Sequence, residues 1–174
     1  MEGLESINSV SFNQDSGCFV VSTSEGIRVF NTDAFQSTFY RNFKGGIKFA
    51  AMLYRTNIIS FVGTGENPSF PSSRLVLWDD IAHRPFGELN FKTDVLATQL
   101  RKDKIVVVLV NKVYVYNFEQ LDCTDTFVTC NNPDGVVSFS TGEEACVLAI
   151  PDETVGHVRI VHFSKDKEIV QFKC

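Results

Sequence analysis

The residues of this chain that could do chemistry form three small groups: a glycine loop, a histidine pair and a cysteine pair. The loop, residues 63–68 with the sequence GTGENP, has two of the three glycines of a dinucleotide-binding loop. Pro68 replaces the third glycine and no helix is expected to follow, so an ordinary loop is favoured over a nucleotide site. His157 and His162 are five residues apart on one expected strand. They therefore point to opposite faces and cannot share a metal ion.

The thiols and the remaining motifs give no catalytic centre either. Cys123 and Cys130 flank an expected strand, and structural thiols are favoured over a redox pair. The sequence has no G-x-S-x-G elbow, no H-E-x-x-H and no C-x-x-C. We therefore expect a non-enzymatic protein without catalytic residues, cofactor or metal. Five scattered cysteines, an odd number, indicate a reducing compartment, and hence a cytosolic protein.

Composition favours an ordered all-β protein. The 174 residues are 44% hydrophobic and 21% charged, and 16 phenylalanines with only five prolines favour strands over helices. A net charge of −5 argues against a general nucleic-acid binder, which needs a basic face. The first residues lack the basic and apolar regions of a signal peptide, and no apolar run approaches 18 residues.

A repeated strand pattern organises the chain. Residues 67–80, NPSFPSSRLVLWDD, contain an alternating apolar strand that ends in two aspartates. Similar strands begin near residues 27, 75, 113 and 158, so their starts are 48, 38 and 45 residues apart. One such strand in each period of about forty residues is typical of a β-propeller blade.

The sequence therefore predicts one partial β-propeller with about four blades of four antiparallel strands. The expected blades cover residues 1–44, 45–92, 93–130 and 131–174. Turn chemistry and alternation place the sixteen strands at Ile7–Phe12, Cys18–Ser22, Gly26–Asn31, Gln36–Asn42, Ile47–Tyr54, Ile58–Gly63, Arg74–Asp79, Phe86–Phe91, Val95–Leu100, Lys104–Val110, Lys112–Asn117, Thr124–Thr129, Val136–Phe139, Ala145–Ile150, Gly156–Phe163 and Glu168–Phe172.

Two polar segments are candidates for a partner-binding surface. Asn13 and Asp15 lie in an expected turn at a blade edge, where turn chemistry alone could also explain them. The long loop at residues 63–73, with Asn67 and Pro68, is the second segment, since loops of this length often carry a function. Trp78 and Asp79 are expected to be structural, the indole packing between blades and the carboxylate fixing the next turn. Partner contact is the alternative for both.

Several segments resemble the PROPPINs, the WD-repeat proteins that bind phosphoinositides in autophagy. The resemblance extends over nearly the whole chain and keeps the order and spacing of the family's early blades. The segments are Phe12–Asp15 with Gly26–Asn31, Phe43–Ile47 followed by Ala51–Asn57, Asn67–Asp80, Arg101–Leu109, Asn132–Gly135 and Gly156–Val158.

The resemblance implies a WD-repeat propeller of which this chain is the N-terminal half. PROPPINs have seven blades and bind phosphatidylinositol 3-phosphate and phosphatidylinositol 3,5-bisphosphate through two basic pockets beside an Arg-Arg-Gly motif. This sequence contains no Arg-Arg pair, and the motif would lie beyond Cys174. Residues 43–46, FKGG, echo it with one cation only, whereas an inositol phosphate needs several convergent donors. No lipid-binding residue is therefore carried over.

The resemblance also implies a function. It is that of a phosphoinositide effector and scaffold in autophagosome assembly, which recruits autophagy proteins to phosphatidylinositol 3-phosphate membranes. The expected partners include the lipid-transfer protein of the growing phagophore. The expected location is the cytosol and the periphery of the phagophore assembly site or endosomal membranes. The alternative is a truncated protein-interaction scaffold without lipid binding. In either case four blades alone leave apolar faces uncovered, so we expect the isolated chain to associate or aggregate.

Overall fold

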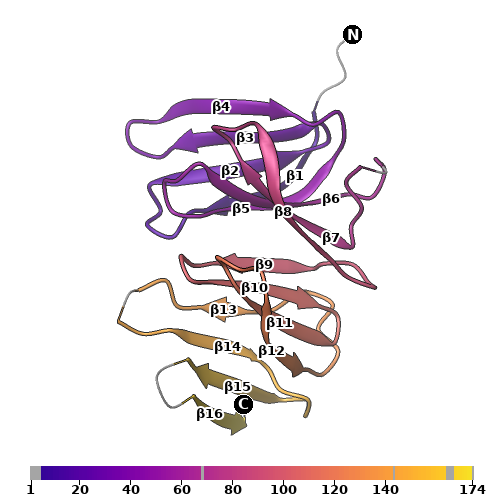
Figure 1. Cartoon of the computed structure of the whole chain (residues 1–174), viewed down its shortest axis with the longest axis vertical. Helices are drawn as coiled ribbons and strands as arrows, with labels where there is room; N and C mark the ends of the chain where they lie inside the picture. Colours follow the sequence, from indigo (N-terminus) through magenta and orange to yellow (C-terminus); the bar gives the residue numbers. More distant parts are fainter. Residues whose placement is uncertain (1–4, 68, 143, 164–166, 174) are drawn as a thin grey trace. The chain divides into compact units, whose positions relative to one another are not determined.

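The chain folds into strands and turns arranged as four antiparallel sheets of four strands each (Figure 1). The computed structural model describes residues 5–67, 69–142, 144–163 and 167–173. The chain forms two compact units, Met1–Asp94 and Val95–Cys174, with two sheets in each. The predicted all-β class and the four-stranded sheets are confirmed. Each predicted blade segment contains one sheet, while the exact blade boundaries stay a prediction.

The first unit contains the first and second sheets. Within each of them, consecutive strands along the chain are neighbours, as expected for meanders joined by short turns. The strands are β1 (Ile7–Phe12), β2 (Cys18–Thr23), β3 (Gly26–Asn31) and β4 (Gln36–Asn42) in the first sheet, and β5 (Ile47–Met52), β6 (Ile58–Gly63), β7 (Arg74–Asp79) and β8 (Arg84–Asn90) in the second.

The second unit contains the third and fourth sheets, which have the same meander order. Their strands are β9 (Ala97–Leu100), β10 (Lys104–Leu109), β11 (Lys112–Asn117) and β12 (Cys123–Val128) in the third sheet, and β13 (Ser138–Phe139), β14 (Val147–Pro151), β15 (His157–His162) and β16 (Glu168–Lys173) in the fourth.

Six strands are shorter than predicted, namely β5, β9, β10, β13, β14 and β15. At β5 and β13 a side chain holds the adjoining backbone in a turn. β5 ends at Met52 rather than Tyr54, because Tyr54 has a φ of 50° and its N–H donates to Oε1 of Gln14 at 2.6 Å. β13 begins at Ser138 rather than Val136. The side chain of Asn132 there accepts from Val136 N–H at 2.8 Å and donates to its carbonyl at 3.1 Å.

The core of the first unit lies where the second sheet packs on the first. Val20, Ile27 and Val29 of the first sheet are at most 1% exposed. They belong to one apolar cluster with six buried residues of the second sheet: Ile47, Ala50, Met52, Ile59, Phe61 and Val76. Alternation along the strands, shifted by a β-bulge between Ile47 and Phe49 on β5, directs these side chains to the shared face.

An aromatic group closes the rim of this core. The indole of Trp78 meets the ring of Phe43 edge-on, with centroids 5.1 Å apart, and lies 6.4 Å from Phe61. Phe70, from the loop between β6 and β7, packs on Phe43 and Phe61 at 5.6 and 5.5 Å. Offset and edge-on aromatic pairs are favourable beyond the area that they bury. The long loop is therefore anchored to the core by its own side chain.

The core of the second unit has the same construction. Val106 and Val108 on β10 and Val113 and Val115 on β11 point to one face, where they pack with Phe139, Leu148, Ile150 and Val161 of the fourth sheet. β10 is buried at every position from Ile105 to Leu109, as its unbroken apolar sequence predicts. Nη1 of Arg101, between β9 and β10, donates to the carbonyls of Gly142 and Ala145 at 2.6 and 2.8 Å. These hydrogen bonds fix the loop between β13 and β14.

Replacing Trp78 by alanine should destabilise the first unit by about 3 kcal/mol, because it removes a large side chain and leaves a void beside Phe43 and Phe61. Chemical denaturation followed by far-UV circular dichroism measures the effect; fluorescence is unsuitable since Trp78 is the only tryptophan. The matched control is Ile81→Ala at a position 78% exposed, with an expected change of about 0.5 kcal/mol or less. Equal midpoints for Trp78→Ala and wild type would contradict the assigned packing.

Candidate functional site: a polar pocket between the first and second sheets

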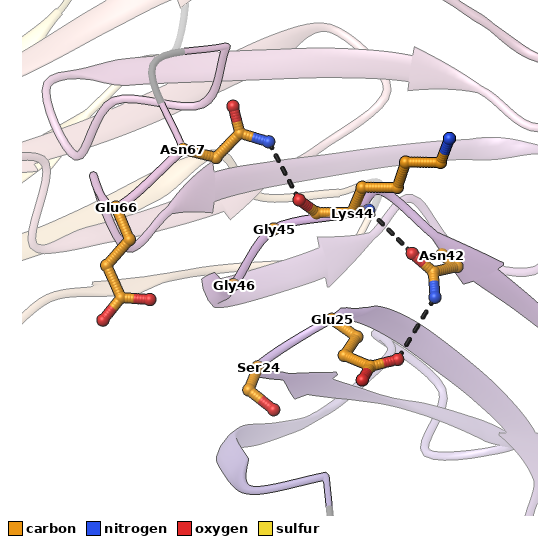
Figure 2. A pocket seen from close by; sticks show the side chains of 8 residues that line it. All are labelled: Ser24, Glu25, Asn42, Lys44, Gly45, Gly46, Glu66 and Asn67. Atoms are coloured by element: carbon orange, nitrogen blue, oxygen red, sulfur yellow. Dashed lines mark hydrogen bonds between the residues drawn. The ribbon is translucent and has the colours of Figure 1, made fainter. Parts of the chain in front are cut away.

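An open pocket of about 590 Å³ lies where the loops of the first and second sheets converge (Figure 2). Four segments line it: the turn between β2 and β3, the end of β4, the connection into β5, and the loop between β6 and β7. The lining residues are Ser24, Glu25, Asn42, Lys44, Gly45, Gly46, Glu66 and Asn67. We call this site the edge pocket.

A chain of hydrogen bonds joins these segments across the two sheets. Nδ2 of Asn67 donates to the Lys44 carbonyl at 3.1 Å, and the Lys44 N–H donates to Oδ1 of Asn42 at 2.7 Å. Nδ2 of Asn42 in turn donates to Oε2 of Glu25 at 3.2 Å (Figure 2). Asn67 also accepts from the Ser69 N–H at 2.9 Å. The wall of the pocket is thus a connected network, which preorganises it for a ligand.

Two glycines allow the segments to approach this closely. A Cβ at Gly45 would lie 2.7 Å from Cβ of Asn67, and one at Gly46 would lie 2.8 Å from Oγ1 and Cγ2 of Thr64. Both distances are shorter than van der Waals contact. The Gly-Gly pair therefore sets how near the long loop lies to the connection between the sheets.

The charges of the edge pocket suit a cation better than an anion. Glu25 and Glu66 are both exposed and supply two carboxylates, while Lys44 is the single cation in the lining. In Figure 2 the Lys44 ammonium extends away from both carboxylates. A phosphorylated inositol would meet two negative charges here and one positive charge. A lysine or arginine side chain of a protein partner would find acceptors instead.

Asn13, which the sequence offers as a partner-binding residue, is occupied within the fold. Its side chain is buried, with the residue only 4% exposed. Its Oδ1 accepts from the Cys18 N–H at 3.0 Å, and its Nδ2 donates to the Tyr54 carbonyl at 3.1 Å. Asn13 thereby fixes its own turn and ties that turn to the second sheet. It offers no free group to a partner.

Asp15 lies in the same turn but is exposed. Its carboxylate accepts from the Gly17 N–H at 2.9 Å and from Nε of Arg55 at 2.9 Å. The Gly17 hydrogen bond and the Arg55 contacts hold the pKa of Asp15 below its ordinary value. Since both partners are exposed, the ion pair itself contributes little to stability.

The structure does not bring the two predicted partner-binding segments together. Asn13 contacts Tyr54, just after β5 ends, whereas Asn67 contacts Lys44, just before β5 begins. Six residues of extended strand separate these ends, roughly 20 Å. The segments therefore lie at opposite ends of the sheets and cannot form one small site. Pro68 lies outside the described residues.

Trp78 and Asp79 have contacts that account for them structurally. Besides the aromatic group around Trp78, Oδ1 of Asp79 accepts from Nδ2 of Asn57 at 2.6 Å and from the N–H groups of Ile81 and Ala82 at 2.9 and 3.0 Å. The carboxylate thus organises the turn from β7 to β8 and fixes the preceding turn of the same sheet.

Sequence reasoning missed the ion pair between Arg41 and Asp80. Nε and Nη2 of Arg41 donate to the two Asp80 oxygens at 2.6 and 2.9 Å, a bidentate pair that joins the first sheet to the second. It also missed Glu25 and Asn42 in the edge pocket. The partners in these contacts are 17 to 39 residues apart in the sequence, and no local sequence pattern signals such pairs.

The residues that the structure describes contain no group of three or more His, Cys, Asp or Glu side chains that could hold a metal ion. A helix long and apolar enough to cross a membrane does not occur among them.

No protein-family model matches the chain, but curated relatives do. SVP1-like protein 2 of Pichia angusta is 36% identical over 166 residues, 92% of this chain and 46% of that protein. Autophagy-related protein 18b of Arabidopsis thaliana is 37% identical over 145 residues, 83% of this chain and 39% of that protein. The chain is related to the PROPPINs. It spans less than half the length of these curated relatives.

Solved structures agree on the fold. Crystalline Hsv2 of Kluyveromyces marxianus, a PROPPIN, matches with a TM-score of 0.79 and 21% identity, covering 95% of this chain and 50% of that one. Atg21, solved in complex with the coiled coil of Atg16, matches with a TM-score of 0.70 and 22% identity, covering 90% of this chain and 52% of that one. The predicted PROPPIN-like β-propeller fold is thereby confirmed.

Acid should reveal the role of Asp79. Hydrogen bonds from the Ala82 N–H, the Asn57 side chain and the Ile81 N–H hold its pKa below the ordinary 3.8. A carboxylate with a lowered pKa stabilises the fold fully above its unfolded pKa, and this contribution is lost as the pH falls below it. Asp79→Asn should therefore have a lower melting temperature than wild type at pH 7. The difference between the two melting temperatures should shrink between about pH 4 and pH 2. Thermal melts by circular dichroism test this; a gap independent of pH would contradict it.

Proposed function

We propose that this PROPPIN relative is a non-enzymatic scaffold in autophagosome assembly that holds a protein partner at the edge pocket. Relatives carrying autophagy-related names support the pathway. The observation that carries the binding role is the edge pocket itself. It is open and polar, and its wall is fixed by a hydrogen-bond network anchored on two packed sheets. Binding loops on a rigid scaffold are a common arrangement for recognition.

The partner is another component of the autophagy machinery. A structurally similar propeller, Atg21, was solved with the coiled coil of Atg16, which supports a protein as the partner class. The phagophore lipid-transfer protein is the second candidate. The carboxylates of Glu25 and Glu66 would accept hydrogen bonds from a lysine or arginine of either partner. Charge-assisted bonds of this kind fix the register of a bound segment.

Lipid binding is not proposed for these residues. The setting that we propose is the one that the resemblance to PROPPINs implies: recruitment of autophagy proteins to phosphatidylinositol 3-phosphate membranes, in the cytosol and at the phagophore assembly site or endosomal membranes. The edge pocket carries one cation against two carboxylates, which does not suit a phosphoinositide. The charges of the edge pocket therefore favour the alternative stated in the sequence analysis, a protein-interaction scaffold that does not itself bind lipid.

Partner binding can be tested by charge reversal in the edge pocket. Wild type should retain the Atg16 coiled coil or the phagophore lipid-transfer protein of the same organism in a pull-down. Glu25→Lys/Glu66→Lys should weaken retention by about tenfold or more, because it replaces two acceptors with cations. Glu119→Lys, at an exposed turn of the second unit, is the matched control and should bind as wild type.

Two results would count against this function. If wild type retains neither protein, the scaffold role is wrong. If the double variant binds as well as wild type, the edge pocket is not the contact surface.

Vesicle flotation tests the lipid half of the proposal. The chain should float no better with vesicles containing phosphatidylinositol 3-phosphate or phosphatidylinositol 3,5-bisphosphate than with phosphatidylcholine vesicles, because the edge pocket carries one lysine and two glutamates. A full-length PROPPIN serves as the positive control. Flotation that depends on the inositol phosphate would show a lipid site that this account lacks.

A further inference from the structure

The edge pocket presents its two carboxylates on different sheets. Glu25 lies on the turn between β2 and β3 of the first sheet, and Glu66 lies on the loop between β6 and β7 of the second. Both are exposed, and no ion pair joins either of them to a lysine or arginine among the residues that the structure describes. The volume of about 590 Å³ is typical of pockets that enclose a ligand larger than one side chain. The edge pocket therefore has room and charge for two cationic groups of one ligand.

The Glu25 carboxylate is held in place by the first sheet. Oγ1 of Thr23 accepts from the N–H groups of Glu25 and Gly26 at 3.2 and 3.1 Å. The Glu25 carbonyl accepts from the Phe43 N–H at 2.9 Å. The carboxylate itself accepts from Nδ2 of Asn42 at 3.2 Å. Because the Asn42 side chain is neutral, it fixes the position of the carboxylate without removing its charge.

The position of the Glu66 carboxylate depends on the loop that carries it. Phe70 anchors this loop to the core of the first unit, four residues beyond Glu66. Next to Glu66 in the sequence, Nδ2 of Asn67 donates to the Lys44 carbonyl at 3.1 Å. Oδ1 of the same side chain accepts from the Ser69 N–H at 2.9 Å and closes a turn within the loop. Asn67 thus shapes the loop through its oxygen and ties it to the connection between the sheets through its nitrogen.

Lys44 takes part in this arrangement through its backbone and not through its charge. It has a left-handed backbone conformation with a φ of 53°, and its N–H donates to Oδ1 of Asn42 at 2.7 Å. Its carbonyl accepts from Asn67, whereas its ammonium extends away from Glu25 and Glu66 (Figure 2). The single cation of the lining is therefore not placed to neutralise the two carboxylates.

We propose that the edge pocket binds a dibasic segment, with one cation at Glu25 and the other at Glu66, and that Asn67 is the positioning residue that sets the spacing between these carboxylates. This ligand class rests on the proposed function of the edge pocket as a partner-binding site. Arginine suits the site, because its guanidinium presents N–H donors in a planar fork that matches a carboxylate. Asn67 acts through geometry, since its amide holds the loop that carries Glu66 against the connection that Asn42 joins to Glu25.

Peptide titration followed by two-dimensional nitrogen–proton NMR of the 174-residue chain tests the ligand class. The probe is acetyl-Arg-Gly-Arg-amide, with acetyl-Arg-Gly-Gln-amide and acetyl-Gln-Gly-Gln-amide as the singly charged and neutral controls. The dibasic peptide should shift the backbone N–H signals of the residues that line the edge pocket. The singly charged peptide should bind about fivefold more weakly, because it forms one ion pair in place of two. No binding, equal affinity for both charged peptides, or shifts confined to other residues would overturn the dibasic ligand.

Asn67→Asp tests the positioning role, because charge and geometry predict opposite results. The new carboxylate can still accept from the Ser69 N–H but cannot donate to the Lys44 carbonyl. If net charge alone decided affinity, a third carboxylate would strengthen binding of the dibasic peptide. Since the hydrogen bond that holds the loop is lost, we expect Asn67→Asp and Asn67→Ala to weaken binding by about threefold to fivefold. Asn111→Asp, at an exposed turn of the second unit, adds the same charge and should bind as wild type.

The outcomes separate the geometry of the edge pocket from its function. Peptide binding by Asn67→Asp should still weaken as the salt concentration rises, because both glutamates remain and only their spacing has changed. Asn67→Asp that binds the dibasic peptide as tightly as wild type would overturn the positioning role, even where the pull-down retains an autophagy protein. If the peptide binds as expected but the pull-down retains neither protein, the scaffold function is wrong and the ligand chemistry stands.

Discussion

Each sheet of this chain carries apolar side chains on both faces, and each face must therefore be covered. β10 shows the requirement fully met, with Ile105 to Leu109 at most 5% exposed. In the first sheet, by contrast, Phe12 and Phe35 are more than half exposed. Stacking sheet on sheet is the arrangement that buries both faces of a four-stranded meander. The packed cores of both units and the aromatic rim follow from it.

The edge pocket is a consequence of this stacking. When two meanders pack face to face, the turns at one end of their strands converge. Polar groups of loops from different sheets then meet, as the Asn67 side chain and the Lys44 carbonyl do. Gly45 and Gly46 let the backbones come close enough for these bonds. The packed cores supply the rigidity, and the loops supply the polar groups.

Much of the fold could be predicted from the sequence, because strand alternation and turn chemistry are local. The strand Arg74–Asp79 was predicted to the residue by the alternation that ends at Trp78. The end of β5 was predicted wrongly because a distant contact decides it: Gln14 holds the Tyr54 backbone in a turn across 40 residues. A propensity argument has no access to such a contact.

The site was less predictable for the same reason. Asn13 is a typical turn residue, so the sequence predicts that it is exposed. Its side-chain amide nevertheless donates to the Tyr54 carbonyl, 41 residues away in the sequence, and is buried there. Glu25 and Asn42 carry no motif, and only the packing of two sheets makes them neighbours of Asn67. Gly45 and Gly46 could be recognised in the sequence, but their close approach to Asn67 and Thr64 could not be predicted from it.

The central claim is that the second sheet packs on the first and thereby holds the loops of both sheets around the edge pocket. Hydrogen–deuterium exchange of wild type and Trp78→Ala tests it most directly, comparing β2 and β3 of the first sheet with β10 and β11 of the second unit. The expected result is that Trp78→Ala speeds exchange in β2 and β3, and in β6 and β7, while β10 and β11 keep their wild-type protection. Exchange in β2 and β3 that Trp78→Ala leaves unchanged would contradict it.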